Sequence, residues 1–170
     1  NIPVNGQIPL HKDHEALLAF FEENVRPNLK TFPTVAEKIA YLLAHDYIES
    51  DFIQKYAMDF ITDLSDWLYA QNFQFKSFMA AYKFYQQYAL KTNDGEFYLE
   101  NIEDRILMNA LYFVDGDTEL AQSLADELIH QRYQPATPSF LNAGRSRRGE
   151  LVSCFLIQAT HDINRIGRSV

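Results

Sequence analysis

The feature that most constrains the fold is the helical spacing of apolar and aromatic residues along the first three quarters of the chain. Side chains of this kind recur every three or four positions, which is the pattern of helices that bury one face. The stripes are Leu17, Phe20, Phe21 and Val25; Ile39, Leu42 and Leu43; Ile53, Tyr56, Ala57, Phe60, Ile61, Leu64, Trp67 and Leu68; Phe78, Ala81, Tyr82, Tyr85 and Tyr88; Ile102, Ile106, Asn109, Ala110 and Phe113; and Leu120, Ala121, Leu124, Leu128 and Ile129. The sequence therefore predicts a mainly α body of about six helices over residues 13–130. The ring spacing favours a packed core over a ligand path.

Polar residues stand where several of these helices would begin. Asp13, Ser50 and Asp117 can each accept a hydrogen bond from a backbone N–H of the first helical turn. Thr34 is followed three residues later by Glu37, which is the capping-box pattern. We therefore expect helices to start at these four positions.

Length and composition are those of an ordinary globular chain. With 170 residues, 47% of them hydrophobic, it suits one domain, or one domain and the start of another. The single cysteine, Cys154, allows no internal disulfide, which fits a reducing compartment such as the cytoplasm. No apolar run reaches the length of a membrane span, and no signal peptide opens the chain. The first residue is Asn1 rather than Met, which indicates a trimmed or partial chain.

The net charge of −8 is unevenly distributed. From Arg132 onward the chain has six Arg, no Lys and two acidic residues, so this part carries +4 and residues 1–131 carry −12. An acidic helical body argues against a nucleic-acid surface. Arg145, Arg147 and Arg148 suit phosphate recognition through their guanidinium forks, or they solvate a turn. Both interpretations stay open at this level.

Histidines and acidic residues give no metal-binding pattern. The five His are scattered, and none stands at metal-ligand spacing from a second ligand. Asp59, Asp63 and Asp66 resemble a carboxylate cluster, but no His accompanies them. We expect them to line a solvated helix face and predict no metal site.

The helical pattern stops at two prolines. Pro135 and Pro138 prevent a helix from running through both positions and favour extended backbone at Gln134 and Thr137. A short apolar run follows at residues 151–157, typical of a strand buried on both faces. Cys154 lies in the middle of this run, where an inert cysteine is the common case.

Several stretches closely resemble the large subunits of ribonucleotide reductases, and the class Ib enzymes are the best match. The strongest contains a Gln-Pro-Ala-Thr-Pro segment, an Asn-Ala-Gly turn, a basic turn and a Ser-Cys pair within residues 134–154. Residues 8–13, 84–95 and 103–111 also look like class Ib sequence. The resemblance covers essentially the whole chain.

The resemblance implies a fold and a domain organisation. An N-terminal helical domain would be followed by the first strand of a ten-stranded α/β barrel that is otherwise missing. Residues 1–90 would form an N-terminal helical region, in which a reduced remnant of the family's activity cone is one interpretation. Residues 91–148 would complete the helical domain and carry a substrate loop, and residues 149–170 would begin the barrel.

The resemblance also implies an activity and its residues. The family reduces ribonucleoside diphosphates to deoxyribonucleoside diphosphates by thiyl-radical chemistry with a redox cysteine pair. Cys154 looks like one member of that pair, with its partner outside this chain, and a dithiol suits the task because its disulfide is reducible by thiol exchange. Thr137 and Ser153, with Cys154, look like substrate-binding positions. His161 and Asp162 fall in the effector segment, where His161 replaces a common acid. Alone, the chain would be inactive.

The implied partners follow from the same family. No cofactor is expected in this subunit itself; nucleotide effectors (dNTP or ATP) would bind it, and a small subunit with a dimetal-tyrosyl centre would supply the radical. A glutaredoxin-like or thioredoxin-like protein would donate electrons, and the large subunit would form a homodimer, with no nucleic-acid or membrane partner. The alternative is a stand-alone helical interaction or regulatory module whose Cys154 strand pairs with another chain.

Overall fold

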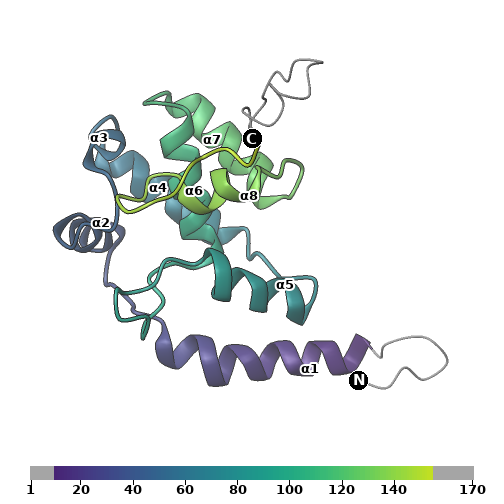
Figure 1. Ribbon diagram of the computed structural model, residues 1–170. Helices are drawn as coiled ribbons and strands as arrows, with labels where there is room; N and C mark the ends of the chain where they lie inside the picture. Colours follow the sequence, from purple (N-terminus) through teal and green to yellow (C-terminus); the bar gives the residue numbers. More distant parts are fainter. Residues whose placement is uncertain (1–9, 155–170) are drawn as a thin grey trace, which may run out of the picture.

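The computed structural model describes residues 10–154, which form helices and connecting turns without a β-strand (Figure 1). The α-helices of this part are α1 (Leu10–Phe20), α2 (Val35–Ala44), α3 (Ser50–Ile53), α4 (Met58–Ala70), α5 (Phe78–Lys83), α6 (Ile102–Phe113), α7 (Thr118–Ile129) and α8 (Thr137–Asn142). The mainly α prediction is confirmed. The predicted count of about six is too low, because eight α-helices stand within the described range.

Helix α6 lies at the centre of the larger core. It packs against α7, α4 and α3, and α2 packs on α4 (Figure 1). Residues 104–111 of α6 are buried without interruption, so this helix is covered on all sides. A capping box fixes its start: Asp104 accepts a hydrogen bond from the backbone N–H of Asn101 at 2.7 Å and pairs with Lys38 at 2.6 Å.

A second, aromatic cluster joins α1 to α5. Each of the two helices continues into a π-helical turn, Phe21–Val25 after α1 and Phe84–Tyr88 after α5. Phe21 and Tyr85, one from each turn, pack edge to face with ring centroids 5.6 Å apart. The buried members are Phe20, Val25, Ala81, Phe84, Tyr85, Ala89 and Tyr98. The expected packing of aromatic stripes into a core is confirmed.

Two of the predicted helix caps are confirmed and two are wrong. Thr34 accepts from the N–H of Glu37 at 3.1 Å, and Asp117 accepts from the N–H of Leu120 at 3.0 Å. Helix α1 already begins at Leu10, and the Asp13 carboxylate instead accepts from the N–H of Phe78 at the start of α5. Ser50 is the first residue of α3, with Glu49 as its N-cap.

The predicted continuous helix from Ser50 to Leu68 is divided into α3 and α4. Between them the Tyr56 hydroxyl donates to the carbonyl of Leu111 and accepts from the N–H of Gly116, both at 2.8 Å. Ala57 is extended, with ψ of 142°. Tertiary hydrogen bonds to Tyr56 thus accompany a break that the apolar spacing does not reveal.

The apolar spacing predicts a helix from about Tyr98 to Phe113, but α6 begins only at Ile102. The residues just before it are extended and pair with distant backbone: the Tyr98 N–H donates to the carbonyl of Asn28, and the Leu99 N–H donates to that of Leu90, both at 2.7 Å. These pairs give a partner to N–H groups that the first turn of a longer helix would leave without one.

The strand predicted over residues 151–157 is wrong where the structure describes it. Residues 151–154 have no strand conformation, and Val152 is 55% exposed. A strand needs neighbours for its backbone hydrogen bonds, and the described part of the chain offers none here. Residues 155–157 lie outside the described range.

Candidate functional site

Helix α8 begins at Thr137, so the prediction of extended backbone at this residue is wrong. Pro138 occupies the first helical turn, where its missing N–H has no helical partner to lose. The Thr137 hydroxyl lies 3.2 Å from the hydroxyl of Tyr88, which belongs to the π-helical turn after α5. No residue of α8 is fully buried. The helix therefore lies on the surface of the larger core.

A cavity of about 470 Å³ adjoins the start of α8. Aromatic side chains form much of its wall, and Lys76 and Lys83 add positive charge. Its lining residues are Phe73, Phe75, Lys76, Ala80, Lys83, Phe84, Tyr88, Ile102, Ile106, Leu128, Gln131, Tyr133, Gln134, Pro135, Thr137 and Phe140. Thr137 lines this cavity, whereas Ser153 and Cys154 do not. The three predicted substrate residues thus do not converge on one pocket within the described chain.

The segment that carries Cys154 is fastened to α8 by two hydrogen bonds. The Ser139 hydroxyl donates to the carbonyl of Leu151 at 2.7 Å, and the Asn142 side-chain amide donates to that of Glu150 at 2.8 Å. Helix α8 therefore connects Thr137 at its first residue to the segment that leads to Ser153 and Cys154.

Cys154 is a free, exposed thiol rather than a buried one. Its sulfur lies 3.6 Å from the Ser153 hydroxyl. An apolar strand would bury this cysteine and make it inert, but Cys154 is exposed. Its thiol is therefore accessible to thiol exchange. His161 and Asp162 lie outside the described residues.

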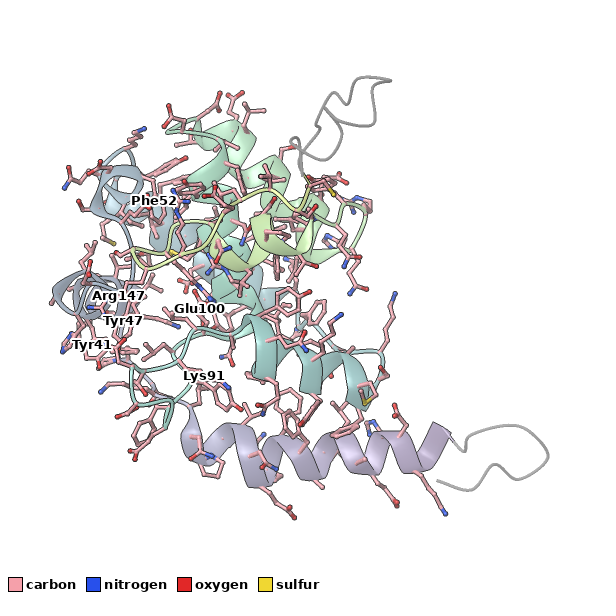
Figure 2. All side chains as sticks on the ribbon, viewed as in Figure 1. Tyr41, Tyr47, Phe52, Lys91, Glu100 and Arg147 are labelled. Carbon is pink, nitrogen blue, oxygen red and sulfur yellow. The ribbon has the colours of Figure 1, made fainter. Side chains whose placement is uncertain are left out.

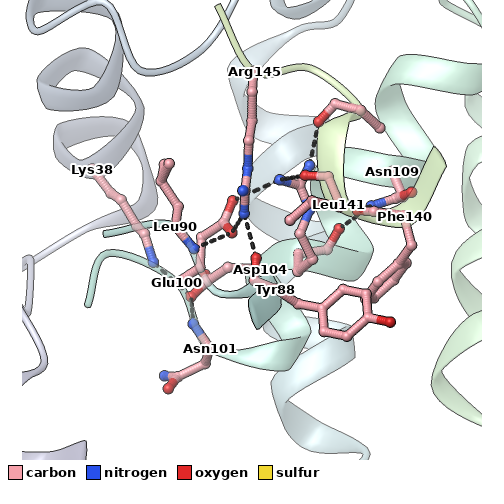
Figure 3. A network of polar contacts seen from close by, with 12 residues as sticks. Lys38, Tyr88, Leu90, Glu100, Asn101, Asp104, Asn109, Phe140, Leu141 and Arg145 are labelled. Atoms are coloured by element: carbon pink, nitrogen blue, oxygen red, sulfur yellow. Dashed lines mark hydrogen bonds and ion pairs between the residues drawn. The ribbon is translucent and has the colours of Figure 1, made fainter. Parts of the chain in front are cut away.

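A buried ionic network lies beneath α8 (Figure 3). The Glu100 carboxylate is 1% exposed and pairs with Arg105 at 3.3 Å and with Arg145 at 3.0 Å. It also accepts the N–H of Leu90 at 3.0 Å. Burial raises the pKa of Glu100, but the two guanidinium groups, with the N–H of Leu90 and the charge of Lys38, outweigh it and hold the pKa below the usual 4.5. Burial lowers the pKa of Arg105 to about 10, so both groups are ionised at neutral pH.

Side chains of α6 bind the backbone at the end of α8 (Figure 3). Arg105, with 0% exposure, donates to the carbonyls of Leu141 at 3.4 Å and of Ala143. The Asn109 side-chain amide donates to the carbonyl of Phe140 at 3.0 Å. The residue pattern alone does not single out Glu100, nor does it reveal the contacts of Arg105 and Asn109. The one available signal was Asn109, a polar residue in an otherwise apolar stripe.

The basic turn at residues 145–148 is engaged within the chain. Arg145 is buried in the ionic network, and its guanidinium also donates to the carbonyl of Tyr88. Arg147 pairs with Asp46 at 3.6 Å, on the side of the molecule where Figure 2 shows Tyr41 and Tyr47. Arg148 pairs with Glu49 at 3.1 Å. These pairings favour a structural function for the three arginines over phosphate recognition.

Two further findings concern the described range only. No group of three His, Cys, Asp or Glu within it could hold a metal ion, and Asp59, Asp63 and Asp66 are exposed as expected. None of its helices is long and apolar enough to span a membrane.

Comparison with known proteins assigns both parts of the chain to related families. Residues 1–73 match the family "Ribonucleotide reductase N-terminal", and residues 74–148 match "Ribonucleotide reductase, all-alpha domain". The relative named "Ribonucleoside-diphosphate reductase subunit alpha" from Bacillus subtilis (strain 168) is 45% identical over 169 residues, which is 99% of this chain and 24% of the relative. The protein of the same name from Mycoplasma pneumoniae is 42% identical over 158 residues, which is 93% of this chain and 22% of the relative. The chain thus spans about a quarter of the length of these relatives.

Proposed function

Since the chain belongs to the ribonucleotide reductase family, of which it comprises the N-terminal and all-alpha domains, we propose that it is the N-terminal part of a class Ib ribonucleoside-diphosphate reductase large subunit. The whole subunit reduces ribonucleoside diphosphates to deoxyribonucleoside diphosphates by thiyl-radical chemistry. In this proposal residues 149–170 begin a ten-stranded α/β barrel that the rest of the subunit completes.

The observation that carries the proposal is the exposed thiol of Cys154 on a segment fastened to α8. A redox cysteine must be open to substrate and to an external reductant, and Cys154 is exposed. The tether through Ser139 and Asn142 links it to Thr137. Cys154 then acts as one member of the redox pair: two thiols lose two electrons and two protons to the substrate and become a disulfide. The second cysteine and the radical cysteine belong to the rest of the subunit.

The remaining assignments follow from the same proposal. Thr137 and Ser153 contact the substrate beside Cys154, and His161 with Asp162 contributes to the effector contact. This subunit carries no cofactor of its own: nucleotide effectors bind it, and a small subunit with a dimetal-tyrosyl centre supplies the radical. A glutaredoxin-like or thioredoxin-like protein reduces the disulfide, the large subunit forms a homodimer, and the enzyme works in the cytoplasm.

The test replaces Cys154 in the full-length subunit by Ala and by Ser. Both variants should keep the wild-type melting temperature and bind substrate, yet lose dithiol-supported turnover, because neither side chain can form the disulfide. The 170-residue chain alone should show no turnover with the small subunit and dithiol. Turnover within a few-fold of wild type in a folded Cys154→Ala enzyme would defeat the proposal and favour a stand-alone helical module.

A further inference from the structure

We propose that Glu100, Arg105 and Asn109 are positioning residues for the substrate loop, which is here defined as residues 137–154. The inference rests on the proposed function, because it assumes that Thr137 and Cys154 meet the substrate. The buried ionic network would act on catalysis only through α8 and the segment fastened to it. None of Glu100, Arg105 and Asn109 needs to touch substrate.

Helix α8 needs support from outside itself. It has six residues, which is less than an isolated helix needs for stability, and no side chain caps its start. The last carbonyls of any helix have no partner within the helix. Here the carbonyls of Phe140, Leu141 and Ala143 accept hydrogen bonds from Asn109 and Arg105. The position and direction of α8 are thus set by two side chains of the central helix.

The Glu100 carboxylate links the two ends of α8. One oxygen pairs with Arg105, which binds the carbonyls at the end of the helix. The other pairs with Arg145, which donates to the carbonyl of Tyr88. The Tyr88 hydroxyl in turn lies 3.2 Å from that of Thr137 at the start of the helix. One buried charge therefore holds partners at both ends of the same short element.

The network reaches the redox segment through α8 itself. Ser139 and Asn142, both on α8, bind the carbonyls of Leu151 and Glu150. A displacement of α8 would therefore move the chain that leads into Cys154. Displacements of about 1 Å can cost on the order of a hundredfold in rate even when they arise far from the reacting atoms.

Stability alone is a weak reason for such a network. Burying an ion pair costs about as much desolvation free energy as its attraction returns, and apolar replacements of similar volume are often neutral or stabilising. Moreover, four buried atoms have no hydrogen-bond partner among the described residues: Glu100 Oε1, Arg105 Nε, Asn109 Oδ1 and Arg145 Nε. An apolar core would avoid that cost, but it could not bind three backbone carbonyls in fixed directions.

The experiment uses the full-length subunit with its small subunit and a dithiol. Asn109→Leu keeps the approximate shape of the side chain and removes the donor to Phe140, whereas Arg105→Lys keeps the charge beside Glu100 and loses the guanidinium fork. Ile39→Val and Ile39→Ala serve as matched controls, because Ile39 is 1% exposed on α2 and has no polar group to bind α8. Melting temperature, kcat and KM are measured for each enzyme, together with the alkylation rate of Cys154 by mass spectrometry.

Both network variants should raise KM for the ribonucleoside diphosphate or lower kcat by about tenfold or more. They should also change the alkylation rate of Cys154. The two control variants should have a lower melting temperature but wild-type kinetic constants and a wild-type alkylation rate. Wild-type KM, kcat and alkylation in folded Asn109→Leu would overturn the inference, as would losses no larger than those of the controls at equal melting temperature. If Arg105→Lys does not fold, the kinetic constants and alkylation rate of Asn109→Leu are sufficient to test the inference. Full turnover by Cys154→Ala would instead overturn the proposed function.

Discussion

Helices α6 and α8 lie against each other, but α6 is stabilised by its own residues and α8 by contacts with other elements. Helix α6 has its own capping box and an uninterrupted buried stretch over residues 104–111. Helix α8 has no side-chain cap and no buried residue, and the carbonyls at its end are bound by side chains of α6. The helix without predicted site residues is thus the internally stabilised one, and the helix that carries Thr137 depends on its neighbour.

This difference separates the source of stability from the place of the proposed chemistry. The buried part of the molecule holds the fold, while α8 and the segment that leads to Cys154 are positioned by a few polar contacts. A rigid core that positions less stable functional segments is a common arrangement in proteins. Substitutions in the two regions should therefore have unequal effects on the free energy of unfolding.

The largest effect is expected when the shared carboxylate is neutralised. Glu100→Gln leaves Arg105 and Arg145 buried without a counter-charge, so the free energy of unfolding should fall by about 3–5 kcal/mol. Urea denaturation followed by circular dichroism measures it. Glu96→Gln is the control, because Glu96 is exposed and its loss should change stability by no more than about 0.5 kcal/mol. An equally small change for Glu100→Gln would mean that the network is dispensable.

The same carboxylate gives the chain a defined response to acid. The pKa of Glu100 is lower in the folded state than its usual 4.5, so the unfolded state binds the proton first as the pH falls. The stabilisation is complete above pH 4.5 and is lost as the pH drops through the folded-state pKa. Glu100→Gln should therefore show a shallower loss of stability below pH 4.5 than the wild type, and parallel curves would contradict this.

An intermediate effect is expected at the turn that ends α8. Gly144 has φ of +73°, and a Cβ placed there would lie 2.7 Å from Cζ of Phe52. Gly144→Ala should cost about 2–4 kcal/mol of unfolding free energy, from backbone strain and overpacking together. Gly95→Ala is the control, since Gly95 has a similar φ of +77° but no neighbour within 4 Å. Equal losses at both positions would assign the whole cost to the backbone.

The smallest effect is expected at Cys154, the proposed redox residue. Cys154 is exposed, so Cys154→Ala should change the free energy of unfolding by no more than about 0.5 kcal/mol. The measurement is the same urea titration applied to the 170-residue chain. A loss of about 2 kcal/mol would place the thiol in a packed environment and remove the contrast between the two helices.

The sequence predicts α2 and α7 well and the substrate loop poorly. Thr34 and Asp117 were recognised as caps because they act on the N–H groups of their own helices. Asp13 was misassigned because its acceptor oxygen serves Phe78, 65 residues away. The helix break at Tyr56 is not predictable from local spacing either, because the Tyr56 hydroxyl binds backbone groups of Leu111 and Gly116, which are distant in sequence.

The sequence by itself determined the helical character of this chain and its main apolar faces. Through its resemblance to a family, it also made Cys154 the candidate redox residue. These depend on local spacing and short motifs, which the order of residues states directly. Only the tertiary structure decided that Glu100 is buried between Arg105 and Arg145, and that α6 holds the end of α8. Such contacts join residues distant in sequence, and the free energy of a buried charge depends on which groups surround it after folding.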